Sequence, residues 1–241
     1  LICISLVGLL GACTPTTQEP TQPRPQMSFV RDANSGIAAY RRVANRVEPV
    51  AERICRSIHP SEPRSFCDFQ VKVDPNTKQP PNAYQTIGKD GRPVITFNIN
   101  MLRTFRNDHE IAFVFGHEAG HQIARHIEQT QANQLAGAVL GGILVAVGGG
   151  DASVGVDIGA AIGGRSYSKK FELQADTIAA HVADRAGYNA AIGAKTFERT
   201  GGSSALLATH PPSSQRIAKV ADTIQVIDTA KSQGRRAPVA W

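Results

Sequence analysis

Apolar residues recur at helical spacing along residues 36–58, and this stretch is the clearest element that the sequence predicts. A spacing of three or four residues places apolar side chains on one face of an α-helix. We therefore expect a long amphipathic helix whose apolar face joins the core. The positions that form this face are Ile37, Tyr40, Val43, Val47, Val50, Ile54 and Ile58.

Alternating patterns follow, and they predict a small antiparallel sheet. Residues 69–73 alternate as a short strand, and residues 82–87 and 93–98 flank a Gly-rich turn at 88–91. Two alternating runs around such a turn indicate a hairpin. The second hairpin strand is either an ordinary half-buried strand or an edge strand that pairs with an extended peptide. Under the second interpretation, the substrate strand consists of Val94, Ile95, Thr96, Phe97 and Asn98.

The remaining pattern is helical. One helix is expected to begin near Asn107, because Asn107 and Glu110 have the spacing of a capping box. Residues 132–164 are rich in Ala and Gly, and they allow three interpretations: a lid, a membrane-touching hairpin or plain helix packing. We predict a mainly α (α+β) domain over residues 36–230 and a flexible tail over 231–241. The other predicted helices span residues 168–185, 189–199 and 213–228.

Composition and charge add little to this picture. Hydrophobic residues make up 41% of the chain and charged residues 19%, which is typical of a globular protein. The net charge is +6, but Lys and Arg are scattered rather than clustered. The sequence also lacks a motif that reads a nucleic-acid groove, so we expect no nucleic-acid partner.

The first residues are typical of an export signal. Residues 1–12 are almost wholly apolar, too short to span a bilayer but suited to the core of a signal peptide, of which we expect them to be a remnant. Leu10-Gly11-Ala12-Cys13 resembles the lipobox of bacterial lipoproteins, in which the Cys is acylated. The alternative is an ordinary cleaved signal with an incidental Cys.

The segment after Cys13 supports the lipoprotein interpretation. Residues 13–35 are rich in Pro and Thr near their start, and such a stretch behaves as a semi-extended tether. We therefore expect a periplasmic protein that is held at the membrane by an N-terminal lipid. Thr14 follows the Cys where Asp would favour retention at the inner membrane, so resemblance to lipoprotein sorting signals implies the outer membrane.

Cys55 and Cys67 form an even pair in a compartment that permits disulfides. We expect a disulfide between them, which would pin the intervening loop to the preceding helix. The alternative is a pair of buried thiols.

The chemistry centres on His117-Glu118-Ala119-Gly120-His121. In an α-helix, two residues four positions apart lie about 40° apart on one face, so both imidazoles can bind one Zn²⁺. Glu118 lies roughly 100° from His117, close to the metal but not aimed at it. This position suits a carboxylate that acts as general base on a zinc-activated water.

A catalytic zinc needs a third protein ligand. His126 follows His117 by nine positions, so a continuous helix would place it about 180° away, and we interpret His126 and His109 as surface or packing residues. Glu172 and Asp176 are four positions apart, so one could bind zinc while the other accepts a hydrogen bond from a ligand imidazole. The alternative for this pair is a solvated helix face.

His210 and Arg216 surround a Pro-Pro corner that opens a helix. His210 could hydrogen-bond the developing oxyanion with Arg216 adding positive charge, or it could occupy the open zinc position and hold the site idle. A capping cluster with a salt-bridged Arg is the third interpretation.

Four motifs, in this order, resemble the gluzincin peptidases related to HtpX, BepA and the CAAX endopeptidases. They lie at residues 94–102, 116–121, 167–176 and 209–216, and the resemblance covers residues 36–225. It implies a zincin-like domain, one zinc per chain on His117, His121 and Glu172, and Glu118 as general base. It also implies that Asp176 supports a ligand from behind and that His210 and Arg216 act around the transition state.

The family's integral-membrane members have spanning helices that this sequence lacks, which indicates the lipid-anchored periplasmic branch. We therefore expect a zinc endopeptidase of the bacterial cell envelope that degrades misfolded or unassembled envelope proteins. One rival hypothesis is a zinc-holding chaperone or assembly factor for outer-membrane proteins, with little or no proteolysis. Another is a structural zinc site in which His210 is the fourth ligand.

Overall fold

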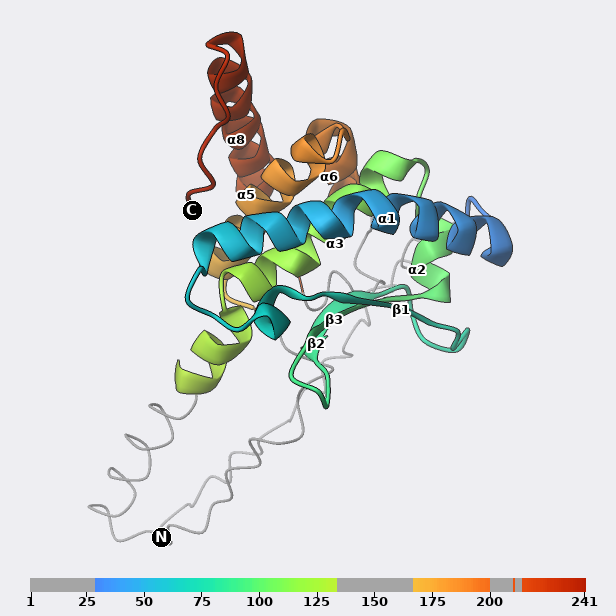
Figure 1. Cartoon of the computed structure of the whole chain (residues 1–241). Helices are drawn as coiled ribbons and strands as arrows, with labels where there is room; N and C mark the ends of the chain where they lie inside the picture. Colours follow the sequence, from blue (N-terminus) through green and yellow to red (C-terminus); the bar gives the residue numbers. More distant parts are fainter. Residues whose placement is uncertain (1–28, 134–166, 200–209, 211–213) are drawn as a thin grey trace, which may run out of the picture.

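The computed structural model describes residues 29–133, 167–199, 210 and 214–241 (Figure 1). The predicted signal remnant, Cys13 and most of the tether lie outside the described residues, as does most of the Ala- and Gly-rich segment 132–164.

The described fold is mostly helical, as predicted. The long first helix α1 spans Ala33–Ile58, and the 3-10 turn η1 spans Arg64–Cys67. The helix that carries both histidines of the motif, α3, spans Asp108–Ile123. The sequence analysis missed one short helix, α2, which spans Ile99–Thr104. A further helical stretch covers residues 126–133, and helices α5 (Lys169–Arg185), α6 (Ala190–Arg199) and α8 (Ser214–Ser232) follow.

Helix α3 is the central element. It packs against α1, α5 and α6 and against two strands of the sheet, and α1 crosses over it in Figure 1. Its start has the predicted cap, since the Glu110 amide donates to the Asn107 side chain over 3.0 Å. The Glu110 carboxylate accepts a hydrogen bond of 2.9 Å from the Arg106 amide, one residue before the Asn107 amide of a standard capping box. Every residue of α3 from Glu110 to Ile123 is buried, polar and apolar alike, so this helix forms the middle of the core.

The sheet is mixed, whereas the sequence analysis predicted an antiparallel one. Its strands are β1 (Gln70–Asp74), β2 (Ala83–Ile87) and β3 (Pro93–Asn98), in the order β1-β3-β2. The predicted hairpin of β2 and β3 is present and antiparallel, and Gly91 in its turn has a φ of 76°, a value that favours glycine. Strand β1, however, pairs with β3 in parallel.

The prediction that residues 94–98 form an edge strand is therefore wrong. Both sides of β3 are paired: Thr96, for example, lies opposite Lys72 of β1 and Tyr84 of β2. Every residue of β3 is buried, which agrees with its central place. The pattern of apolar residues predicts a strand, but it does not reveal how many neighbours the strand has, because pairing with β1 is a tertiary contact.

Two further features hold the periphery together. The predicted disulfide joins Cys55 at the end of α1 to Cys67 in η1, with their Cα atoms 5.6 Å apart. The tail after α8 was expected to be flexible, yet Ala237 is buried and its carbonyl accepts a hydrogen bond of 2.7 Å from Arg185.

Among the helices that the structure describes, none is long and apolar enough to cross a membrane.

Candidate metal centre

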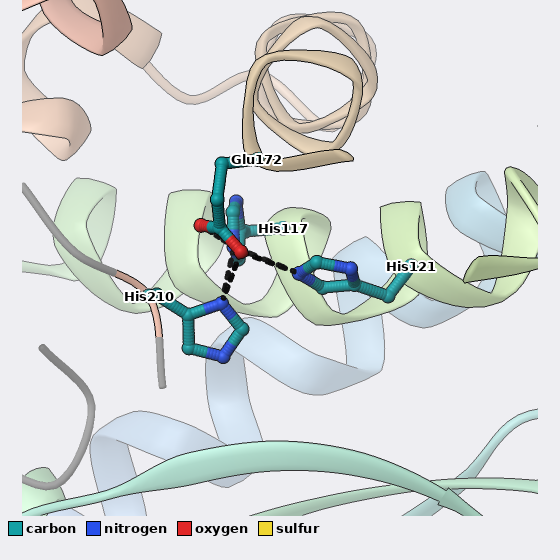
Figure 2. Close-up of side chains that lie close together, drawn as sticks. All are labelled: His117, His121, Glu172 and His210. Carbon is teal, nitrogen blue, oxygen red and sulfur yellow. Dashed lines mark hydrogen bonds and ion pairs between the residues drawn. The ribbon is translucent and has the colours of Figure 1, made fainter. Parts of the chain in front are cut away.

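His117 and His121 lie one turn apart on α3, as the motif predicts, and both are fully buried. Their Nε2 atoms are 3.1 Å apart. Figure 2 shows Glu172 reaching from α5 toward this pair. Its Oε2 atom lies 3.4 Å from His117 Nε2 and its Oε1 atom 3.7 Å from His121 Nε2. The structure thus brings together the three residues that the sequence analysis assigned to zinc.

Close packing of α3 on α5 makes this arrangement possible. A Cβ atom added at Gly116 would lie 3.0 Å from the Cα of Ala179, and one added at Gly120 would lie 3.0 Å from the Cα of Ala175. These contacts are with backbone atoms that cannot easily move aside. The two glycines of the motif helix therefore let the backbone of α5 approach closely enough for Glu172 to reach the histidines.

His210 joins His117, His121 and Glu172, and these four residues form the cluster. Its Nδ1 atom lies 3.1 Å from His117 Nε2 and 2.9 Å from Glu172 Oε1 (Figure 2). Donor atoms of all four residues lie within 4.8 Å of one another. Ligands held at about 2.1 Å in a tetrahedron around zinc are roughly 3.4 Å apart, so these separations match a zinc site.

The chemistry of the donors also fits zinc. Imidazole nitrogens and a carboxylate are typical zinc ligands. Glu172 is almost fully buried, and its Oε2 atom accepts no hydrogen bond from the part of the chain that the structure describes. Burial alone would raise the pKa of Glu172, but the facing His210 and His117 outweigh it and lower this pKa well below its usual range. An ionised carboxylate beside several imidazoles is a suitable binding site for a metal cation.

Glu118 has the properties of a general base. Its side chain is buried, and its Oε1 atom lies 3.6 Å from His210 Nε2 without a hydrogen bond from any described residue. Burial raises the pKa of Glu118, although His210 and His117 oppose this shift. A carboxylate with a raised pKa holds a proton more readily, which suits a group that accepts and returns one near neutral pH.

Asp176 accepts a hydrogen bond from the ring nitrogen of His117 that faces away from the other donors, as predicted. Its Oδ1 atom accepts a hydrogen bond of 2.9 Å from His117 Nδ1. With the proton on Nδ1, the Nε2 lone pair of a neutral His117 faces the cluster. Burial opposes the ionisation of Asp176, but Arg216 outweighs it and keeps the pKa of the carboxyl below its usual range. In the metal-free chain, burial is outweighed by Asp176 and Glu172, and the pKa of His117 rises to about 9, so zinc binding would release a proton from this ring.

Arg216 is buried behind the cluster. Its Nε and one terminal nitrogen each donate to Asp176 over 2.7 Å, and the other terminal nitrogen donates to the His210 carbonyl over 3.1 Å. The guanidinium also lies 3.9 Å from the ring centre of Phe197. The sequence analysis placed Arg216 around the transition state. These contacts match its third interpretation, a salt-bridged Arg, and give the residue a positioning role.

The interpretation of His126 as a packing residue is confirmed, but the expectation that it points away from His121 is wrong. That expectation assumed a helix that continues past His121, but α3 ends at Ile123 and Arg125 adopts a φ of 57°. The turn changes the direction of the chain, and His126 is fully buried with its Nδ1 atom 2.9 Å from His121 Nδ1. No pattern in the sequence indicated this turn, because Arg rarely adopts a positive φ. His109, by contrast, packs on Tyr188, away from the cluster, and accepts a hydrogen bond from the Asn189 amide.

Comparison with known proteins agrees with this geometry. The model of peptidase family M48 matches residues 41–224, which include every residue of the cluster. The chain is also similar to the mitochondrial metalloendopeptidase OMA1 of Arabidopsis thaliana, with 34% identity over 122 residues. That match covers 48% of this chain and 24% of the relative, so the chain spans about a quarter of the relative's length.

Proposed function

This chain belongs to peptidase family M48, and on that premise we propose that it is a zinc-dependent endopeptidase. One zinc ion would be held by His117, His121 and Glu172. The observation that carries the proposal is the meeting of these three donors, within zinc-binding distances, beside a buried Glu118 whose Oε1 atom accepts no hydrogen bond from the described residues. A structural site would have no use for that carboxylate.

The protein's own residues supply the proton chemistry. Zinc, when bound, contributes Lewis acidity, which activates water and polarises the scissile carbonyl. Glu118 accepts the proton from the attacking water and returns it to the leaving amine. His210, at 3.6 Å from Glu118, is close enough to hydrogen-bond the oxygen on which negative charge develops. Arg216 holds the His210 backbone in place.

We further propose that an extended peptide lies along β2 rather than β3. Among the described residues, β2 pairs only with β3 and so leaves one edge open. It is also tied to the catalytic helix, because the Gln85 side chain donates a hydrogen bond of 3.0 Å to Gln122, the neighbour of His121. A peptide added to this edge by main-chain hydrogen bonds would run beside the metal.

The primary test is cleavage of an unfolded protein such as casein by the zinc-loaded chain. Glu118→Gln removes the base and leaves the three ligands, so we expect activity to fall by about 100-fold or more with zinc content unchanged. Asp222→Asn, an exposed carboxylate on α8, is the matched control and should cleave like the wild type. Equal cleavage by Glu118→Gln at equal zinc content would contradict the mechanism.

A second candidate function, a zinc-holding chaperone or assembly factor, is favoured by one observation. His210 Nδ1 is as close to His117 and Glu172 as a fourth ligand would be, and four protein ligands would close the site. Replacement of His210 by Ala separates the candidates. A protease would keep its zinc on His117, His121 and Glu172 and would still cleave casein, at a rate reduced by the loss of the hydrogen bond from His210. A holding protein would prevent aggregation of unfolded clients without cleaving them, whether or not His210 is present.

For its setting, we propose the periplasmic face of a bacterial outer membrane, with misfolded or unassembled envelope proteins as substrates. The support is the apolar run before Cys13 and the Pro-rich tether after it. Incorporation of a labelled fatty acid tests the anchor. The label should be lost in Cys13→Ser, and a labelled Cys13→Ser protein would contradict lipidation at that residue.

A further inference from the structure

A strained turn directly after the metal-binding helix is the starting point. Arg125 is the only non-glycine residue among the described positions with a positive φ. Such a backbone is disfavoured for residues that carry a Cβ, and it persists only where the surroundings hold it. Here the Arg125 guanidinium is held between Glu62 at 2.5 Å and Glu128 at 2.6 Å. The effect of the turn is to bring His126 back against His121.

A chain of three hydrogen-bonding side chains results. His121 Nδ1 lies 2.9 Å from His126 Nδ1, and His126 Nε2 lies 3.0 Å from Gln174 Oε1. Phe171 stacks flat on the His126 ring, with ring centres 4.3 Å apart and planes 11° apart. Phe171 and Gln174 both belong to α5, the helix that supplies Glu172. The ring of His126 is therefore fixed in both position and rotation.

The polarity of this chain follows from its last member. The Gln174 oxygen accepts hydrogen bonds and does not donate them, so it places the His126 proton on Nε2. His126 Nδ1 then carries a lone pair, and the hydrogen bond to it requires the His121 proton to be on Nδ1. His121 Nε2 is left with its lone pair directed at His117 and Glu172, which is the form of imidazole that binds zinc.

We infer that His126 is a positioning residue, which with Gln174 sets the tautomer and orientation of His121 for metal binding. This inference rests on the proposed zinc site. It gives the two ligand histidines different supports: His117 donates to the carboxylate of Asp176, and His121 donates to a neutral ring. The alternative is that His126 only fills space under α5, and the two roles predict different zinc affinities.

Zinc affinity, measured by competition with a chromogenic chelator, distinguishes them, and the melting temperature of the metal-free protein is recorded in parallel. His126→Phe keeps an aromatic ring on Phe171 but removes the acceptor, and we expect it to bind zinc about 10–100-fold more weakly. His181→Phe is the matched control, since His181 is a buried histidine of α5 that touches none of His117, His121, Glu172 and His210. It should leave zinc affinity within about threefold of the wild type, whatever it does to the melting temperature.

Gln174 provides a second pair of variants on a partly exposed side chain, in case His126→Phe does not fold. Gln174→Glu keeps the acceptor oxygen and should preserve zinc affinity, whereas Gln174→Leu removes the acceptor and should weaken it. In the zinc-loaded wild type, imidazole ¹⁵N shifts should place protons on His126 Nε2 and His121 Nδ1.

The inference is overturned if His126→Phe and Gln174→Leu bind zinc as tightly as the wild type, or if Gln174→Glu weakens binding as much as Gln174→Leu. A proton found on His126 Nδ1 would also overturn it. If the wild-type protein binds no zinc, the metal centre itself is overturned. The same conclusion follows if the His121→Ala variant still binds one zinc ion as tightly as the wild type. The two failures are therefore distinguishable.

Discussion

At the scale of single residues, the site depends on charges that are buried together. Glu118, Glu172, Asp176 and Arg216 are each at most 2% exposed. A lone charge at that depth would cost several kcal/mol, and the pairing of Arg216 with both Asp176 and Glu172 offsets that cost. Burial also protects the geometry, because each hydrogen bond is stronger where water is excluded.

We therefore expect Arg216→Met to be among the most destabilising single changes in the chain. It leaves two carboxylates without their partner, and loss of one member of a buried ion pair costs about 3–5 kcal/mol. Arg42→Ala is the matched control: Arg42 also binds an aspartate in a two-point contact, with Asp108, but its side chain is 58% exposed. That change should cost under about 1 kcal/mol. Urea unfolding curves measure both, and equal losses would contradict the distinction.

At the scale of elements, the decisive contact is between α3 and α5. Each helix contributes three residues of the site. Helix α3 carries His117, Glu118 and His121, and helix α5 carries Glu172, Gln174 and Asp176. The spacing of the two helices sets the distance from Glu172 to both imidazoles. Small residues at the contact, Gly116 and Gly120 facing Ala179 and Ala175, set that spacing.

Gly120→Ala tests this contact. The new Cβ would meet the Ala175 backbone at 3.0 Å, so α5 must shift and carry Glu172 away from the histidines. We expect overpacking to cost about 1–3 kcal/mol and zinc affinity to fall together with stability. Gly36→Ala has the same crowding, 3.0 Å from the Leu102 carbonyl, but at the contact of α1 with α2. It should lower stability without changing zinc affinity, and parallel losses of affinity would contradict the argument.

At the scale of the whole molecule, the peripheral elements are fastened to a core formed by α1, α3 and α5. The disulfide between Cys55 and Cys67 holds η1 against the end of α1, and the Arg185 bond to Ala237 holds the tail against α5. His181, a buried histidine, lines the same pocket as Arg185 and Ala237 of the tail. Burial, assisted by Arg185, lowers the pKa of His181 to about 4.

This histidine makes folding sensitive to acid. The unfolded chain takes up a proton on His181 below its usual pKa of 6.5, whereas the folded chain does so only near 4. The stability that neutral His181 supports is therefore complete above pH 6.5 and is lost as the pH falls toward 4. Between pH 6.5 and 4, we expect the free energy of unfolding of His181→Leu to fall by up to about 3 kcal/mol less than that of the wild type. Urea unfolding at pH 7, 5.5 and 4.5 measures the difference, and parallel pH curves would contradict it.

The sequence by itself predicted the local structure and most of the chemistry. The helices that carry the site, the hairpin, the Asn107 cap and the Cys55–Cys67 disulfide depend on spacing and neighbouring residue types, which are local properties of a chain. The same holds for His117, Glu118 and His121, because helix geometry alone places them together. The resemblance to a known family added Glu172, with Asp176 behind it.

Tertiary structure alone decided the rest. It put β1 beside β3 and so made β3 a central strand, which alternation cannot reveal because pairing partners lie far apart in the chain. It turned Arg216 into a buried support for Asp176. It also folded His126 back onto His121 through a backbone conformation that Arg adopts only when its surroundings hold it there, by contacts with Glu62 and Glu128.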